Sequence, residues 1–255
     1  KTTLLHYLAL KAAEDQLKGG DFGKSRCPIF VPLAAYDDYL RRNADQLSIE
    51  EFLSTYYQLW HSSPGLNPMF HRELQRGTAL VLLDGLDEVL DVNMRQFVAG
   101  QVQGLMRQWS PQGNQFVLTS RIVGYREAPL SGELPHVTVV DFGRSEIELF
   151  AKKWGSSYEQ FLAGKDKSSP VIERRAAAET RDLLGDIRSN PSLERLAACP
   201  LLLTMLALLR RHVGKLPDRR VELYDRYTRT LIDNWEINRS AGARQKTPQR
   251  FDPHE

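Results

Sequence analysis

The hydrophobic positions of this chain follow two different spacings. Near the start, Leu4, Leu8 and Ala12 recur every four residues, which is the spacing of an amphipathic helix. Residues 78–83 instead form an apolar run of strand length, which is typical of a strand buried on both faces of a sheet. By these patterns the chain alternates strands predicted at 27–33, 78–84, 115–121 and 137–140 with helices predicted at 48–60, 66–76, 92–109 and 146–154.

Strands that alternate with helices predict βαβ units and a parallel sheet, so the expected fold class is α/β. Two local signals refine the element boundaries. Pro28 and Pro32 lack the backbone N–H that a sheet ladder needs, which places the strand at 27–33 on an edge. Ser48 and Glu51 have the spacing of a capping box, in which each side chain satisfies the other residue's backbone N–H at a helix start.

The second half of the chain reads as helical. A polar, loop-like stretch at 164–169 marks the change, and Asn190-Pro191 then combines a helix N-cap with proline at the first helical position. We therefore predict a domain boundary at 164–169.

Composition narrows the class of protein. The chain has 255 residues and a net charge of +2, so its overall charge favours neither nucleic acid nor a membrane surface. Cys27 and Cys199 lie far apart without metal-ligand spacing, which fits a reducing cytoplasm. The longest apolar run, at 200–209, is well short of the roughly 20 residues that span a bilayer. The start of the chain also has no signal-peptide pattern.

The strand at 78–84 runs directly into Asp84-Gly85-Leu86-Asp87-Glu88. Carboxylates that crowd together resist ionisation, so a cation is expected beside them. Ligands of open α/β sheets bind beyond the carboxyl ends of the strands, where Asp84 falls. Mg²⁺ suits such a place because it accepts one or two carboxylates together with phosphate oxygens. The alternative is a buried strand followed by an ordinary polar turn.

Two further segments carry groups suited to phosphate. Lys1-Thr2-Thr3 ahead of a helix resembles the end of a G-x-x-x-x-G-K-[ST] loop, whose lysine contacts phosphates and whose hydroxyl ligates Mg²⁺. The strand at 115–121 releases Thr119, Ser120 and Arg121 at its carboxyl end. Arginine offers a fixed fork of donors for a γ-phosphate. The alternatives are a random terminus and an exposed arginine that ends a strand.

Together these motifs resemble the NACHT-domain NTPases, of the STAND class of P-loop ATPases. The Asp84 to Glu88 segment is similar to the family's Walker B signature, and 118–121 is similar to its sensor 1 strand. Residues 122–127 resemble bacterial members in particular. The resemblance implies a P-loop NTPase core at 1–163, a small helical domain at 164–214 and the start of a winged-helix domain at 215–255. It also implies that the glycine loop and its strand precede Lys1.

The resemblance also implies roles for individual residues. Lys1, Thr2, Thr3 and Pro200 are expected to bind the nucleotide, and Thr2 and Asp84 are expected to hold Mg²⁺. Either Asp87 or Glu88 orients the attacking water, with a preference for Glu88, and Arg121 senses the γ-phosphate.

The implied function is ATP binding and slow hydrolysis as a switch that controls self-association in innate immune or antiphage defence. An N-terminal effector and a C-terminal sensor are expected outside this sequence, and the preference for ATP over GTP stays open. One alternative is a nucleotide-binding scaffold without turnover. Another is a DNA-dependent ATPase, suggested by late basic residues, although acidic residues interleaved with them favour a salt-bridged surface. Residues 1–255 alone are expected to fold poorly, because a central strand is missing.

Overall fold

The computed structural model describes residues 1–18, 25–43, 47–61, 66–164, 169–214, 216–217, 221–229 and 232. The chain divides into two compact units, Lys1–Thr138 and Val139–Glu255. Within the described residues, no helix combines the length and the apolar character that crossing a bilayer requires.

The first unit is built on a parallel sheet, as the sequence predicts. Its described strands are β1 (Cys27–Pro32), β2 (Ala79–Asp84) and β3 (Gln115–Leu118), in the order β1-β2-β3. Pro32 lies opposite Asp84, and Leu83 lies opposite Leu118. This register brings the carboxyl ends of β2 and β3 to the same edge of the sheet.

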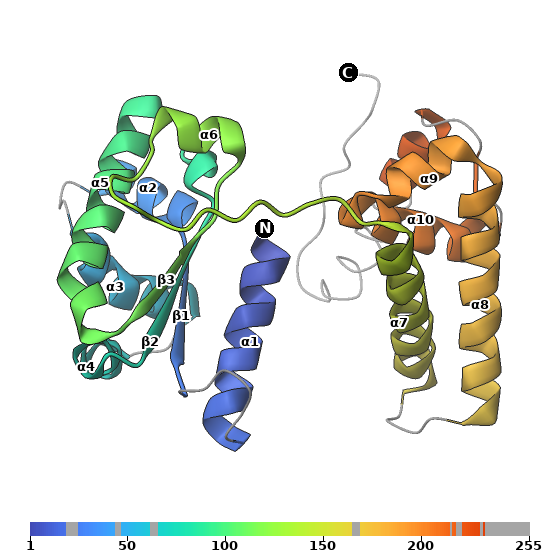
Figure 1. The fold of residues 1–255 in the computed structure, drawn as a ribbon, viewed down its shortest axis with the longest axis horizontal. Helices are drawn as coiled ribbons and strands as arrows, with labels where there is room; N and C mark the ends of the chain where they lie inside the picture. Colours follow the sequence, from blue (N-terminus) through green and yellow to red (C-terminus); the bar gives the residue numbers. More distant parts are fainter. Residues whose placement is uncertain are drawn as a thin grey trace, which may run out of the picture. The chain divides into compact units, whose positions relative to one another are not determined.

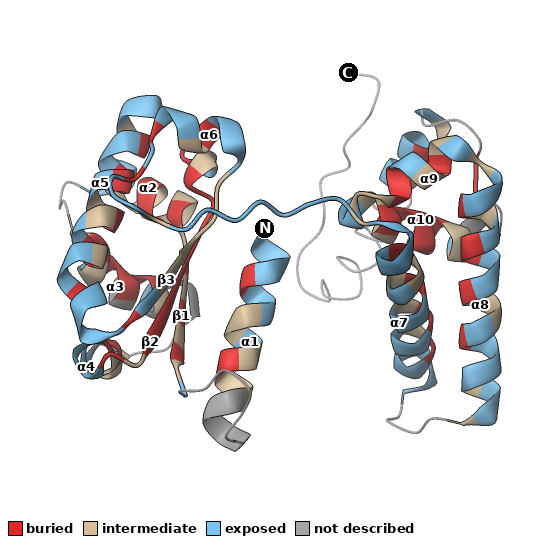
Figure 2. Ribbon diagram, in the orientation of Figure 1, coloured by how far each residue is buried: buried red, intermediate tan, exposed pale blue. Residues whose placement is uncertain are grey.

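Helices cover both faces of this sheet (Figure 1). Helix α1 (Thr2–Lys18) is the one helix of the first unit's described residues that packs on one face, where its Leu5 and Ala12 meet Leu80 and Leu82. The opposite face carries α2 (Leu33–Arg42), α3 (Ile49–His61), α4 (Asn67–Arg76) and α5 (Val92–Trp109). All of β2 is buried (Figure 2), because alternate side chains enter two separate cores.

The helix starts follow their capping signals. Ser48 donates its backbone N–H to the Glu51 carboxylate at 2.9 Å, and Glu51 returns its own N–H to the Ser48 hydroxyl at 3.3 Å. At the start of α5, the Asp91 carboxylate accepts the Met94 N–H at 2.9 Å. The predicted helices at 48–60, 66–76 and 92–109 are therefore confirmed, whereas α2 was not predicted.

Strand β1 forms an edge of the described sheet, as its prolines predict. The Tyr57 hydroxyl from α3 accepts the Phe30 N–H at 3.0 Å and donates to the Phe30 carbonyl at 2.9 Å. This single side chain satisfies both outward-facing backbone groups of Phe30. Since Pro28 and Pro32 have no N–H to offer, this edge is poorly suited to pairing with another strand.

The prediction of a strand at 137–140 is wrong. These residues have no ladder partner among the described residues, and Val137 and Val140 are 91% and 75% exposed. They lie where the sequence passes from the first unit to the second. Apolar residues form a strand only where a neighbouring strand and a core receive them, and the described residues provide neither for this segment.

The second unit is helical. It contains α7 (Arg144–Ala163), α8 (Pro170–Ser189), α9 (Pro191–Ala197) and α10 (Pro200–Val213), followed by a helix at 221–229. Asn190 caps α9 by accepting the Ser192 N–H at 2.9 Å, as its Asn-Pro pair predicts. The helix predicted at 146–154 is longer than expected, because it continues to Ala163.

The compact units divide the chain at a different place from the predicted domains. Helix α7 packs along α8 in the second unit, whereas the sequence assigned residues up to 163 to the first domain. The domain identities at 1–163 and 164–214 therefore stay predictions. Most of the region predicted to begin a winged-helix domain, 215–255, lies outside the described residues.

Candidate functional site at the carboxyl edge of the sheet

A tight turn leaves the carboxyl end of β2. Gly85 adopts the left-handed conformation, with φ of 75°, and the chain then forms a single 3-10 turn, η1 (Leu86–Glu88). A side chain is strained at this φ, and a Cβ atom here would also lie 2.8 Å from the carboxyl carbon of Glu88. Gly85 therefore allows the tight turn that keeps Asp84, Asp87 and Glu88 at the edge of the sheet.

Asp84 lies at the centre of this edge and is 96% buried, with only 4% of its surface exposed. Each of its carboxylate oxygens accepts a hydroxyl: Thr2 donates to Oδ2 at 2.6 Å, and Thr119 donates to Oδ1 at 2.6 Å. The first donor comes from the start of α1 and the second from the end of β3. Asp84 therefore joins three elements that lie far apart in the sequence.

Asp87 binds the two cationic side chains of the site, Lys1 and Arg121. Its carboxylate accepts the Lys1 ammonium and the Arg121 backbone N–H, the latter at 2.8 Å, and the Arg121 Nε lies 3.3 Å from Oδ2. Burial favours the neutral acid, but the bond from Lys1, the bond from the Arg121 backbone and the Lys1 charge together outweigh it. The pKa of Asp87 consequently lies below its ordinary value.

A short helix, α6 (Ile122–Glu127), closes over Asp87. Its Gly124 is buried, and a Cβ atom at this position would lie 2.5 Å from the Cβ of Asp87. The far end of α6 is held by Arg95 of α5, a buried residue that pairs with Glu127 and donates to the Val89 carbonyl at 2.9 and 2.8 Å. The Asp87 carboxylate is thus confined between η1 and α6.

The structure brings Lys1, Thr2, Asp84, Asp87 and Arg121 together at one edge. Glu88 is exposed beside them, and its carboxylate makes no hydrogen bond or ion pair among the described residues. Thr3 is exposed in the first turn of α1. Pro200 is the exposed first residue of α10 in the second unit.

Sequence reasoning placed Thr119 at this edge but did not give it a role. The available signal was its position: Thr119 directly follows β3, one residue beyond Leu118, which pairs with Leu83. In a parallel sheet this register sets Thr119 beside Asp84. Gly124 and Arg95 were also missed, because their importance depends on contacts between separate elements.

The donor set of this edge fits Mg²⁺. The described residues contain no group of three or more His, Cys, Asp or Glu side chains that would make a metal cage. A hydroxyl and a carboxylate already joined to each other are hard oxygen ligands. Mg²⁺ commonly uses one or two such protein groups and completes its shell with water and phosphate oxygens.

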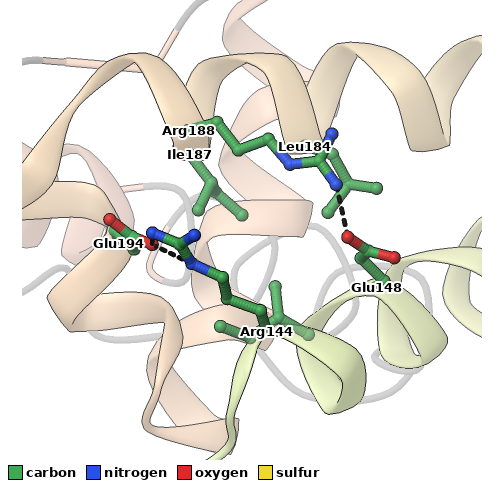
Figure 3. Close-up of a pocket in the computed structure, with 7 residues that line it drawn as sticks. Arg144, Glu148, Leu184, Ile187, Arg188 and Glu194 are labelled. Carbon is green, nitrogen blue, oxygen red and sulfur yellow. Dashed lines mark hydrogen bonds and ion pairs between the residues drawn. The ribbon is translucent and has the colours of Figure 1, made fainter.

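A separate cavity of about 410 Å³ lies within the second unit (Figure 3). Its apolar wall is formed by Ile147, Leu184 and Ile187. Arg144 pairs with Glu194 at 2.8 Å, and Arg188 pairs with Glu148. Because both guanidinium groups are already neutralised and none of the predicted site residues lines it, this cavity does not change the assignment of the site.

A parallel sheet that ends in Asp84, with the Lys1-Thr2 helix start beside it, is the architecture of a P-loop NTPase. The family model of the NACHT domain matches residues 1–158, which is more than half of the chain, and the chain therefore belongs to the NACHT family. Membership makes it an NTPase of the STAND type. A comparison with curated proteins found no match.

Proposed function

We propose that this protein binds ATP with Mg²⁺ and hydrolyses it slowly, as a conformational switch. The hydrogen bond of 2.6 Å between Thr2 and Asp84 carries the proposal. It joins the hydroxyl of a phosphate-binding helix start to a buried carboxylate on the neighbouring strand. A hydroxyl in this position can offer a lone pair to Mg²⁺ while its proton stays on the Thr2 oxygen and points to Asp84.

The remaining groups take complementary roles in this proposal. Lys1 contacts the β- and γ-phosphates, and Thr3 lies in the helix turn whose backbone N–H groups face the anion. Arg121 senses the γ-phosphate, and Pro200 packs near the adenine. Bound Mg²⁺ would neutralise charge on the phosphates. Phosphoryl transfer depends mainly on positioning and charge neutralisation, so these few groups suffice.

The two acidic residues of η1 differ in their availability to water. Asp87 is held by Lys1 and Arg121, and its lowered pKa makes it a weak proton acceptor. The Glu88 carboxylate is exposed, and no described residue engages it. We therefore assign the orientation of the attacking water to Glu88, and we assign to Asp87 the placement of Lys1 and Arg121.

The test is phosphate release by the full-length protein beside Glu88→Gln and Asp87→Asn. Removing a general base commonly costs about 10²- to 10⁴-fold in rate, so Glu88→Gln should lose turnover by that amount while it still binds ATP. Asp87→Asn should keep more turnover than Glu88→Gln. If neither variant lowers a measurable wild-type rate, the hydrolytic roles proposed above are wrong.

The resemblance supports a wider role in which the nucleotide controls self-association during innate immune or antiphage signalling in the cytoplasm. Nucleotide binding without phosphate release would favour the scaffold alternative instead. The late basic cluster lies at 210–229, and each of its described arginines is paired with an acidic residue: Arg210, Arg211, Arg226 and Arg229. This pairing supports a function without nucleic acid. A DNA-dependent ATPase would show stimulation by DNA and a gel shift.

A further inference from the structure

Thr119 is held at the end of β3 by more bonds than a strand terminus requires. Its backbone N–H donates to the Leu83 carbonyl at 2.9 Å, and its carbonyl accepts the Leu86 N–H at 3.0 Å. Its hydroxyl donates to Asp84 at 2.6 Å and accepts the Gly85 N–H at 3.0 Å. One residue thus bonds to four consecutive positions of β2 and its turn.

These contacts determine where the Thr119 proton points. A backbone N–H can only donate, so the hydroxyl must accept from Gly85 and direct its single proton to Asp84. Thr2 directs its own proton to the other oxygen of the same carboxylate. With one hydroxyl on each oxygen, the buried carboxylate has a fixed plane, and the lone pairs of Thr2 keep a fixed direction.

We infer that Thr119 is a positioning residue for the cation of this site, acting through Asp84 rather than touching the cation. The inference rests on the proposed function, because Mg²⁺ is the ion that Thr2 and Asp84 would hold. Groups that orient metal ligands commonly affect metal affinity or activity by roughly 10- to 100-fold. Loss of the Thr119 hydroxyl should therefore weaken the response to Mg²⁺ by that factor.

The competing explanation is that Thr119 only fixes the turn at Gly85. Three variants of the full-length protein separate the two roles. Thr119→Val keeps the shape and removes the hydroxyl, whereas Thr119→Ser keeps the hydroxyl. Ser120→Ala is the matched control, because the neighbouring Ser120 hydroxyl donates at 3.0 Å to the Arg121 carbonyl and not to Asp84.

The experiment measures binding of a fluorescent ATP analogue as Mg²⁺ is added, and again in EDTA. Thr119→Val should raise the Mg²⁺ concentration at which binding of the analogue is half-maximally enhanced by roughly 10- to 100-fold. Its affinity for the analogue in EDTA should equal that of the wild type, and its thermal melt without nucleotide should remain cooperative. Thr119→Ser and Ser120→Ala should respond to Mg²⁺ as the wild type does.

An unchanged Mg²⁺ response in Thr119→Val would overturn the inference. An equal loss of binding with Mg²⁺ and in EDTA would also overturn it, since that result indicates a general role in the fold, as would a serine variant that behaves like the valine variant. Wild-type binding that ignores Mg²⁺ would overturn it directly. Mg²⁺-dependent binding without turnover would overturn only the proposed hydrolysis, so the two proposals fail separately.

Discussion

At the scale of single residues, the site depends on two carboxylates, each of which binds two other side chains. Asp84 receives two hydroxyl groups, and Asp87 receives an ammonium and a guanidinium. The two aspartates of the turn therefore have different environments. Asp84 is buried among neutral donors, and Asp87 is paired with cations. This difference supports the proposal that Asp84 serves the cation and that Asp87 places Lys1 and Arg121, the groups proposed to contact phosphate.

The lowered pKa of Asp87 predicts a specific dependence of stability on pH. A carboxyl whose pKa falls on folding stabilises the protein fully above its ordinary pKa, about 3.9, and this contribution disappears as pH drops through the folded value. Urea unfolding of the whole protein should therefore show a constant difference between wild type and Asp87→Asn from pH 7 to about pH 5, and a shrinking difference below about pH 4.

Glu88→Gln is the matched control for that series, because no described residue pairs with the Glu88 carboxylate. Its free energy of unfolding should stay close to the wild-type value throughout. A difference between wild type and Asp87→Asn that grows as the pH falls would contradict the pairing of Asp87 with Lys1 and Arg121.

At the scale of elements, close approach between helices decides the packing of the second unit. A Cβ atom at the buried Gly155 of α7 would lie 2.9 Å from the Ala176 carbonyl oxygen and 2.9 Å from the Thr180 hydroxyl, both on α8. Gly155→Ala should force α7 and α8 apart and cost about 1–3 kcal/mol of stability, the usual cost of overpacking. Chemical denaturation measures this loss.

Gly185 of α8 supplies the control, since a Cβ atom there meets nothing within 4 Å. Gly185→Ala should stabilise the protein by about 0.5–1 kcal/mol, because alanine loses less conformational freedom in a helix. If both alanine variants shift stability in the same direction, the close approach of α7 to α8 is not what requires Gly155.

Some helices and strands could be predicted from the sequence, and others could not. The helix predicted at 92–109 and the strand predicted at 78–84 agree with α5 and β2, because the hydrophobic pattern of each segment and its flanking signals agree. The segment 137–140 has the same apolar character as a strand but remains unpaired and exposed. Periodicity reports what a segment can bury, whereas pairing depends on which neighbours arrive beside it.

At the scale of the whole molecule, the described sheet is unequal at its two edges. Tyr57 and two prolines protect β1, whereas β3 pairs only with β2 among the described residues. An open edge leaves backbone groups without partners. Another strand would therefore pair at β3 more readily than at β1.

The sequence by itself determined the α/β class, the helix caps at Ser48 and Asn190, and the edge position of β1. It also indicated that Lys1, Thr2, Asp84, Asp87 and Arg121 meet at one edge of the sheet. These features follow from spacing along the chain and from the chemistry of single side chains. Only the tertiary structure decided that Thr119 and Thr2 share Asp84, that Lys1 and Arg121 share Asp87, and that α7 lies with α8. Such choices depend on the register of β2 and β3 and on close approach between elements, which local sequence does not specify.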